Sequence, residues 1–179
     1  FQSVTPRSGG FATVDFTAMG NATIFLVIAL MFIGANSGST GGGIKTSTFA
    51  ILLGSAWNLI RGRTELITFG RRVMPENVVR AGTITTIYTL LVFTGFFLML
   101  VTNPSLRFTP LLFETVSAAA TVGLSLNTTH LLNDPGLIIL SVLMYLGRIG
   151  PVTFALALNL RETSSGRVRY PPERDILVG

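Results

Sequence analysis

The sequence predicts an all-α integral membrane protein in which one membrane crossing is interrupted by a non-helical, glycine-rich segment. Hydrophobic residues make up 49% of the 179 positions and charged residues only 12%, about half the charged share of a soluble domain. Two apolar runs, 82–102 and 136–160, are long enough to cross a bilayer as helices, which takes about 20 residues. Two shorter runs, 22–34 and 44–60, flank the stretch GSTGGGIKTS at 38–47.

The distribution of charge predicts the topology of these runs. The interval 61–80 contains five arginines against two glutamates, and four further arginines lie in the tail at 161–174. Because Lys and Arg accumulate in cytoplasmic loops, we expect both segments on the inner side. The two long runs then cross outward and back, and the two short runs together make one inward crossing. The basic residues form no stripe with interleaved aromatics, so we expect no nucleic-acid partner.

The stretch GSTGGGIKTS looks like a phosphate-binding loop, but Ile44 stands between Gly43 and Lys45 and breaks the required spacing. A continuous helix over 22–60 would be about 60 Å long at 1.5 Å per residue. That length exceeds the roughly 40–45 Å of a whole bilayer. We therefore expect an intramembrane loop at 35–45, because non-helical backbone at that depth must be buried in protein or line a water-filled cavity.

Two stretches repeat: FQSVT at 1–5 and FETVS at 113–117. Each leads to a glycine, Gly10 in the first copy and Gly123 in the second, and each precedes an apolar run. A short helix such as 110–119, a glycine-containing strand and a crossing are the layout of a re-entrant pore loop, whose carbonyls replace the water around an ion. The alternative is that Gly10 and Gly123 are merely turn residues. Because both copies of the motif lead to a glycine and then to an apolar run, we expect instead that the two glycines take part in ion selectivity.

These motifs resemble the Ktr/Trk/HKT superfamily of potassium-translocating membrane proteins, and they are most similar to its Ktr-type membrane subunit. The resemblance implies four potassium-channel-like M1–P-loop–M2 repeats around one pore, with a broken M2 helix. Residues 1–78 would hold the end of the third repeat, and 79–179 the fourth repeat and a cytosolic tail. We expect a C-terminal half of a longer chain. The matching stretches are 1–11, 38–45, 121–125, 147–151 and 172–179.

The resemblance also implies the site residues. The selectivity filter would be formed by two sets, Ser8, Gly9, Gly10 and Phe11 from one repeat, and Thr121, Val122, Gly123 and Leu124 from the next. The first set departs slightly from the family's common Thr-Ala-Gly-Phe. Potassium would bind the backbone of Gly10, Val122 and Gly123. The gate would consist of Arg148 together with Gly38, Ser39, Thr40, Gly41, Gly42, Gly43 and Lys45.

Three charged residues have more than one interpretation. Arg148 lies in the middle of a predicted span, where a charge is costly, and it serves either a buried ion pair or the gate. The predicted spans offer it no acid, so the carbonyls and hydroxyls of 37–48 are its expected acceptors. Lys45 either faces the cavity or extends to the membrane surface. Glu114 is either a cation attractor or a helix-start anion.

The predicted function is selective potassium uptake across the plasma membrane by a multi-pass, bacterial protein. One histidine and no cysteine leave no catalytic arrangement, so we expect no enzyme and no covalently bound cofactor. Sodium is a possible coupling or activating ion. The resemblance implies a homodimer in lipid and a cytosolic ring of RCK subunits, which bind the regulatory nucleotide. A secondary ion-coupled transporter with broken helices is the alternative.

Overall fold

The computed structural model describes residues 1–7, 9–39, 41–62, 67–68 and 71–150, and it is mostly helical. Ser8, Thr40 and the tail from 151 onward, with its basic residues and the motif 172–179, lie outside the described residues. The α-helices are α1 (Asn21–Phe32), α2 (Thr46–Ile60), α3 (Pro75–Thr102), α4 (Phe108–Ala119) and α5 (Asp134–Ile149). Short elements are η1 (Thr5–Arg7), η2 (Phe16–Ala18), η3 (Thr129–Leu131), and the paired strands β1 (Ile67–Thr68) and β2 (Arg71–Arg72).

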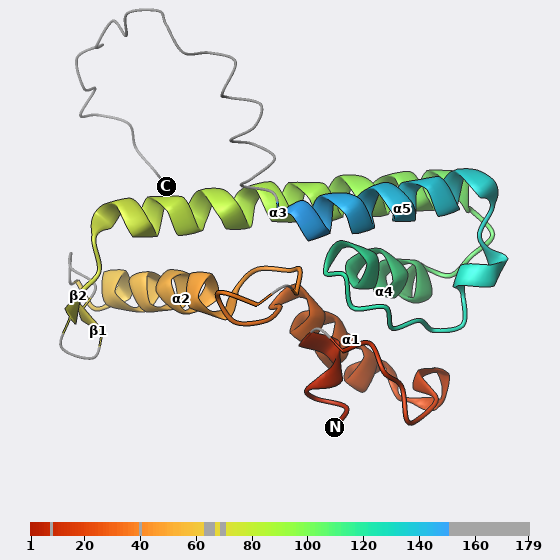
Figure 1. Ribbon diagram of the computed structural model, residues 1–179, viewed down its shortest axis with the longest axis horizontal. Coiled ribbons are helices and arrows are strands. Elements are labelled where there is room, and N and C mark those ends of the chain that lie inside the picture. Colours follow the sequence, from red (N-terminus) through yellow and green to blue (C-terminus); the bar gives the residue numbers. More distant parts are fainter. Residues whose placement is uncertain (8, 40, 63–66, 69–70, 151–179) are drawn as a thin grey trace, which may run out of the picture.

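Helix α3 organises the molecule (Figure 1). Its N-terminal half lies along α2, and its C-terminal half lies along α5 and α4. Helix α4 packs against both α3 and α5, and α1 packs against α4 from the other side. Helix α4 is therefore enclosed by three helices, and each of residues 113–120 is buried.

Among the described residues, α3 is the one helix long and apolar enough to cross a membrane, with a mean hydropathy of 2.1 over its most apolar 18 residues. It starts at Pro75 rather than at the predicted residue 82. Proline suits the first helical turn because its missing N–H needs no partner there, and Glu76 adds a favourable negative charge at the same end. The predicted boundary between the repeats, at 78/79, consequently falls inside α3.

Helix α5 is shorter than the predicted run 136–160. The Asn133 side chain caps its N-terminus by accepting a hydrogen bond of 2.9 Å from the Gly136 amide. At the other end Gly150 has a φ of 84°, a left-handed conformation that stops the helix. The remainder of the predicted run lies outside the described residues.

A polar clamp joins the end of α3 to the start of α5. The buried Asn103 side chain accepts a 3.1 Å hydrogen bond from the Asn133 amide and donates one of 2.9 Å to the Thr102 hydroxyl. The Asn133 side chain in turn donates to the Thr102 carbonyl. Both polar atoms of the buried Asn103 side chain thus have a partner, as buried groups require, and α3 and α5 are fixed to each other at one end.

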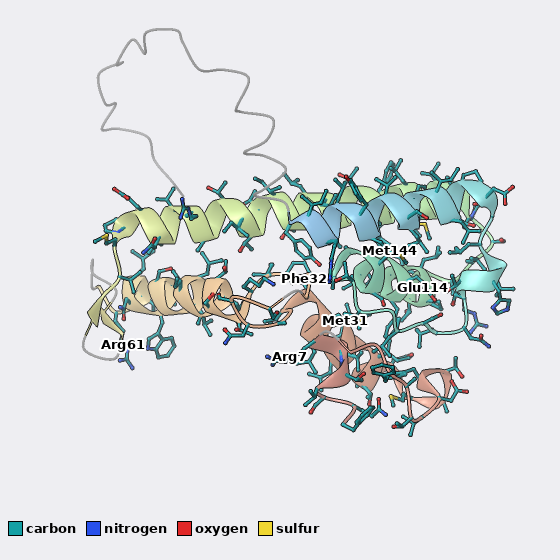
Figure 2. All side chains as sticks on the ribbon, viewed as in Figure 1. Arg7, Met31, Phe32, Arg61, Glu114 and Met144 are labelled. Atoms are coloured by element: carbon teal, nitrogen blue, oxygen red, sulfur yellow. The ribbon has the colours of Figure 1, made fainter. Side chains whose placement is uncertain are left out.

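Two apolar clusters surround α4. One joins α1, α3 and the segment after α4 and includes Phe32 packed against Tyr88, with ring centroids 5.3 Å apart (Figure 2). The other joins α3, α4 and α5 through Met99, Leu111 and Leu143. The outer face of α3 instead exposes large apolar side chains, namely Leu90, Phe93, Phe97 and Val101. Helix α4 is fixed on all sides, so the backbone that follows it is held in a defined place.

Candidate functional site

The glycine-rich stretch interrupts the helical path between α1 and α2, as an excursion that closes at its base. Ile33 and Ile44 form an isolated parallel bridge, and the Ile44 amide donates a 3.0 Å hydrogen bond to the Phe32 carbonyl. The two sides of this base are in contact. A β-carbon built on Gly34 would lie only 2.0 Å from the Gly42 carbonyl oxygen. We call residues 33–45 the loop.

Lys45 holds the loop together from within. Its ammonium group donates hydrogen bonds to the Ser39 carbonyl at 2.9 Å and to the Gly41 carbonyl at 2.5 Å. Two of the carbonyls that the sequence offered to Arg148 thus accept from Lys45. The Ser37 hydroxyl, another predicted acceptor, pairs with the Ser47 hydroxyl. The Lys45 side chain is partly buried and folds back onto its own loop.

The backbone after α4 makes a tight reversal. The Val122 amide donates to the Ser117 carbonyl at 2.9 Å, and the Thr121 amide donates to the Ala118 carbonyl at 3.0 Å. This pair of bonds is a Schellman motif, whose left-handed position is usually glycine. Here that position is Thr121, with a φ of 54°. A β-branched residue in this region is an outlier and costs on the order of 1–3 kcal/mol.

The corresponding segment of the first copy reverses in a similar way. The amides of Gly9 and Gly10 both donate to the Thr5 carbonyl, at 3.0 and 3.2 Å. The Thr5 hydroxyl donates to the Phe11 carbonyl at 2.8 Å, and Gly10 has a φ of 65°. Both predicted filter stretches therefore contain a left-handed residue shortly after the end of a helix.

Three separate segments meet backbone carbonyls at the C-terminal end of α4 and in the segment directly after it. A β-carbon on Gly147 of α5 would lie 2.0 Å from the Ala119 carbonyl oxygen. One on Gly42 of the loop would lie 2.6 Å from that of Ala120, and one on Gly10 would lie 1.9 Å from that of Val122. Only glycine permits these approaches. The three glycines lie far apart in the sequence, and the structure brings them to one place at the negative end of a helix dipole.

Glu114 lies in the middle of α4 and is only 5% exposed (Figure 2). One carboxylate oxygen accepts a hydrogen bond from the Ser125 hydroxyl, and the other accepts one of 3.1 Å from the Thr129 hydroxyl. The helix-start interpretation is wrong, because the first turn of α4 contains no acidic residue. Glu114 instead ties the backbone beyond Gly123 to α4.

Sequence reasoning missed the matching anchor in the first copy. The Gln2 side chain donates a 2.6 Å hydrogen bond to the Thr13 hydroxyl. Gln2 and Glu114 occupy the same place in the two repeated motifs, FQSVT and FETVS. Their shared position was the signal that could have revealed both anchors.

Arg148 lies in the last turn of α5, directly after Gly147, and its side chain is exposed. The preceding residue, Gly147, lies against the Ala119 carbonyl, and Gly42 of the loop lies against the Ala120 carbonyl. The last turn of α5 and the loop therefore both adjoin the end of α4.

Asp15 follows the first predicted filter stretch, residues 8–11, and its carboxyl group is ionised. Hydrogen bonds from the Thr17 hydroxyl at 2.7 Å and the Thr17 amide at 2.8 Å lower the pKa of this exposed carboxyl. Its negative charge lies in the interval predicted to face outward.

An apolar helical chain with glycine-rich backbone segments gathered at one helix end is typical of a membrane transport protein. Residues 1–166 match the TrkH family, described as cation transport proteins, and the chain belongs to this family. It is a family of membrane transporters rather than of enzymes.

Several relatives match along nearly the full chain. The "Ktr system potassium uptake protein B" of Bacillus subtilis is 39% identical over 171 residues, which cover 96% of this chain and 38% of that protein. The protein of the same name from Vibrio alginolyticus is 39% identical over 179 residues, which cover 100% of this chain and 38% of that protein. The "Potassium/sodium uptake protein NtpJ" of Enterococcus hirae is 34% identical over 182 residues, which cover 100% of this chain and 40% of that protein. This chain spans about two fifths of the length of these relatives.

Proposed function

We propose that this chain forms the end of the third and the whole of the fourth of four M1–P-loop–M2 repeats of a potassium uptake protein in the bacterial plasma membrane. The observation that carries the proposal is the convergence of Gly10, Gly42 and Gly147 on the carbonyls at the end of α4. In this assignment α1 and α2 are the two halves of a broken M2 helix. Helix α3 is the next M1, α4 the pore helix and α5 the start of the last M2.

The filter consists of the backbone at Gly10 and at Val122–Gly123. Carbonyl oxygens there replace the hydration shell of the ion, and the negative end of α4 favours a cation at the same place. In the structure the Val122 carbonyl lies against the α-carbon of Gly10. An ion bound between the two strands therefore has to displace this contact.

The loop and Arg148 form the gate below the filter. The loop touches the end of α4 through Gly42, and α5 touches it through Gly147, directly before Arg148. Two positive charges beside the ion path raise the energy of a passing cation, most strongly where water is excluded. Movement of the loop would remove both the obstruction and one of these charges.

Regulation would involve the basic segments on the predicted inner side. The arginine-rich interval 61–80 and the tail would provide the cytosolic surface for a ring of nucleotide-binding RCK subunits. Homodimerisation in the membrane would place two such surfaces on one ring. Sodium, which appears in the name of the Enterococcus hirae relative, is a candidate coupling or activating ion.

Replacing Gly123 tests the filter. Its φ of 91° is unfavourable for any side chain, although no atom lies within 4 Å of an added β-carbon. Gly123→Ser in the full-length protein should lower the ratio of potassium to sodium uptake in cells that lack other potassium systems. Gly20→Ala, at an open position with an ordinary backbone, is the control. An unchanged ratio of potassium to sodium uptake at normal expression would contradict the filter assignment.

The alternative is a secondary transporter, whose substrate sites are also formed by broken helices. Liposomes containing the full-length protein separate the two mechanisms. Flux that rises linearly with the driving force indicates a channel, whereas saturation with a fixed ion stoichiometry indicates a transporter.

A further inference from the structure

The loop makes a direct hydrogen bond to the residue that begins the predicted filter strand. The Gly42 amide donates to the Thr121 hydroxyl at 3.1 Å, across 79 positions of sequence. The contact is enclosed, because Gly42 is buried and its α-carbon also lies against the Ala120 carbonyl. The loop and the end of α4 are thus joined at a defined point.

Thr121 is an unusual residue for its position. The reversal after α4 requires a left-handed backbone, which glycine adopts without strain. Threonine adopts it here with a φ of 54°. Strained residues of this kind persist only where their surroundings hold them, and they concentrate at functional sites and switches. Glycine would satisfy the reversal but would have no hydroxyl for the loop.

We propose that Thr121 is a positioning residue through which the loop sets the geometry of the filter strand. The proposal rests on the proposed function and adds to it that ion selectivity depends on the position of the loop. With the loop in place, the Gly42 amide supports the strained backbone of Thr121. The peptide that follows Thr121 carries the Thr121 carbonyl and the Val122 amide, so the start of the segment that leads to the Val122 carbonyl is fixed as well. When the loop moves away, this support is lost and the carbonyl turns.

The contact can be cut from either side. Thr121→Val removes the hydroxyl and keeps the β-branched shape, whereas Thr121→Ser keeps the hydroxyl. Gly42→Ala keeps the amide but pushes the loop away, since its β-carbon would lie 2.6 Å from the Ala120 carbonyl oxygen. Thr83→Val is a matched control on the exposed surface of α3, where the hydroxyl bonds only to its own helix.

The measurement is the ratio of potassium to sodium uptake by the full-length protein in liposomes. Thr121→Val and Gly42→Ala should each lower the ratio about two- to tenfold, the range expected for one net hydrogen bond. The double variant should lower it hardly further, because both changes remove the same contact. Thr121→Ser and Thr83→Val should keep the ratio of the unmodified protein.

Three outcomes would overturn the proposal. The first is a Thr121→Val protein with an unchanged ratio while Gly123→Ser lowers it, which would leave the filter assignment standing. The second is a double variant whose loss is the product of the single losses. The third is an unchanged ratio in both Thr121→Val and Gly123→Ser, which would remove the proposed function as well. Thr121→Gly deletes the same hydroxyl without strain and replaces Thr121→Val if that protein fails to reach the membrane.

Discussion

The hydroxyl of Ser125 donates a hydrogen bond to the buried carboxylate of Glu114, across 11 positions of sequence. The bond connects the strand after Gly123 to the middle of α4, and the Thr129 hydroxyl adds a second connection to the same carboxylate. The first copy of the motif has its own version, between Gln2 and Thr13. Each predicted filter strand is therefore anchored to the polar residue that follows the phenylalanine of its motif.

The anchor predicts a stability effect at Glu114. Glu114→Leu removes the acceptor of two hydroxyl groups, of which Ser125 is partly buried and Thr129 exposed, and a typical hydrogen bond contributes about 0.5–1.5 kcal/mol net. Glu114→Gln retains an acceptor oxygen and should lose less. Thermal unfolding of the purified full-length protein in detergent measures both, with Ser125→Ala as the variant that removes one donor alone. A Glu114→Leu variant with the same melting temperature as the unmodified protein would contradict a stabilising role of Glu114.

Lys45 predicts a change in the loop. Lys45→Met removes the donor to the Ser39 and Gly41 carbonyls, so the loop should loosen and potassium flux should rise. Lys45→Arg keeps the charge and the donors and should stay nearer to the unmodified protein.

Labelling separates this loosening from a general loss of structure. This chain contains no cysteine, so Ser39→Cys introduces one thiol into the loop, in a background without other cysteines. A water-soluble maleimide should label it faster when Lys45 is methionine. Equal labelling rates with equal flux would exclude a role of Lys45 in holding the loop.

Gly147 predicts a packing effect. A β-carbon there would lie 2.0 Å from the Ala119 carbonyl oxygen, and a backbone atom cannot give way as a side chain can. Gly147→Ala should force α5 away from α4 and lower the melting temperature. Gly82→Ala in α3 is the matched control, because nothing lies within 4 Å of its β-carbon. Alanine is the better helix former by roughly 1 kcal/mol, so the control should be neutral or stabilising. Equal behaviour of the two variants would refute the close approach.

Arg148 predicts a joint effect with the loop. Arg148→Ala removes a positive charge directly after Gly147, which lies against the end of α4, and potassium flux from liposomes should rise. Arg148→Lys should be intermediate, since it keeps the charge but loses the planar fork of donors. If arginine and loop form one gate, deletion of residues 37–42 combined with Arg148→Ala should leak hardly more than either change alone. Additive effects, or lower flux in the alanine variant, would assign Arg148 another role.

The sequence by itself determined where most of the helices lie and that the segment between α1 and α2 is not helical. Apolar runs of sufficient length mark α1, α2 and α3, and the glycines at 38–43 exclude a helix between the first two. These are local properties of backbone freedom and side-chain hydropathy, so they can be read in order along the chain. Hydropathy did not determine the helix ends: α3 begins at Pro75, ahead of its apolar run, because helix-starting residues set that end.

Only the tertiary structure decided which atoms meet. Nothing in the sequence periodicity places the Gly42 amide on the Thr121 hydroxyl, 79 positions away. The left-handed backbone of Thr121 was equally hidden, since threonine is a poor choice for that conformation when judged alone. Both depend on how α4 is fixed by α1, α3 and α5. Packing between distant segments is a property of the whole fold, and it decides where a backbone carbonyl points.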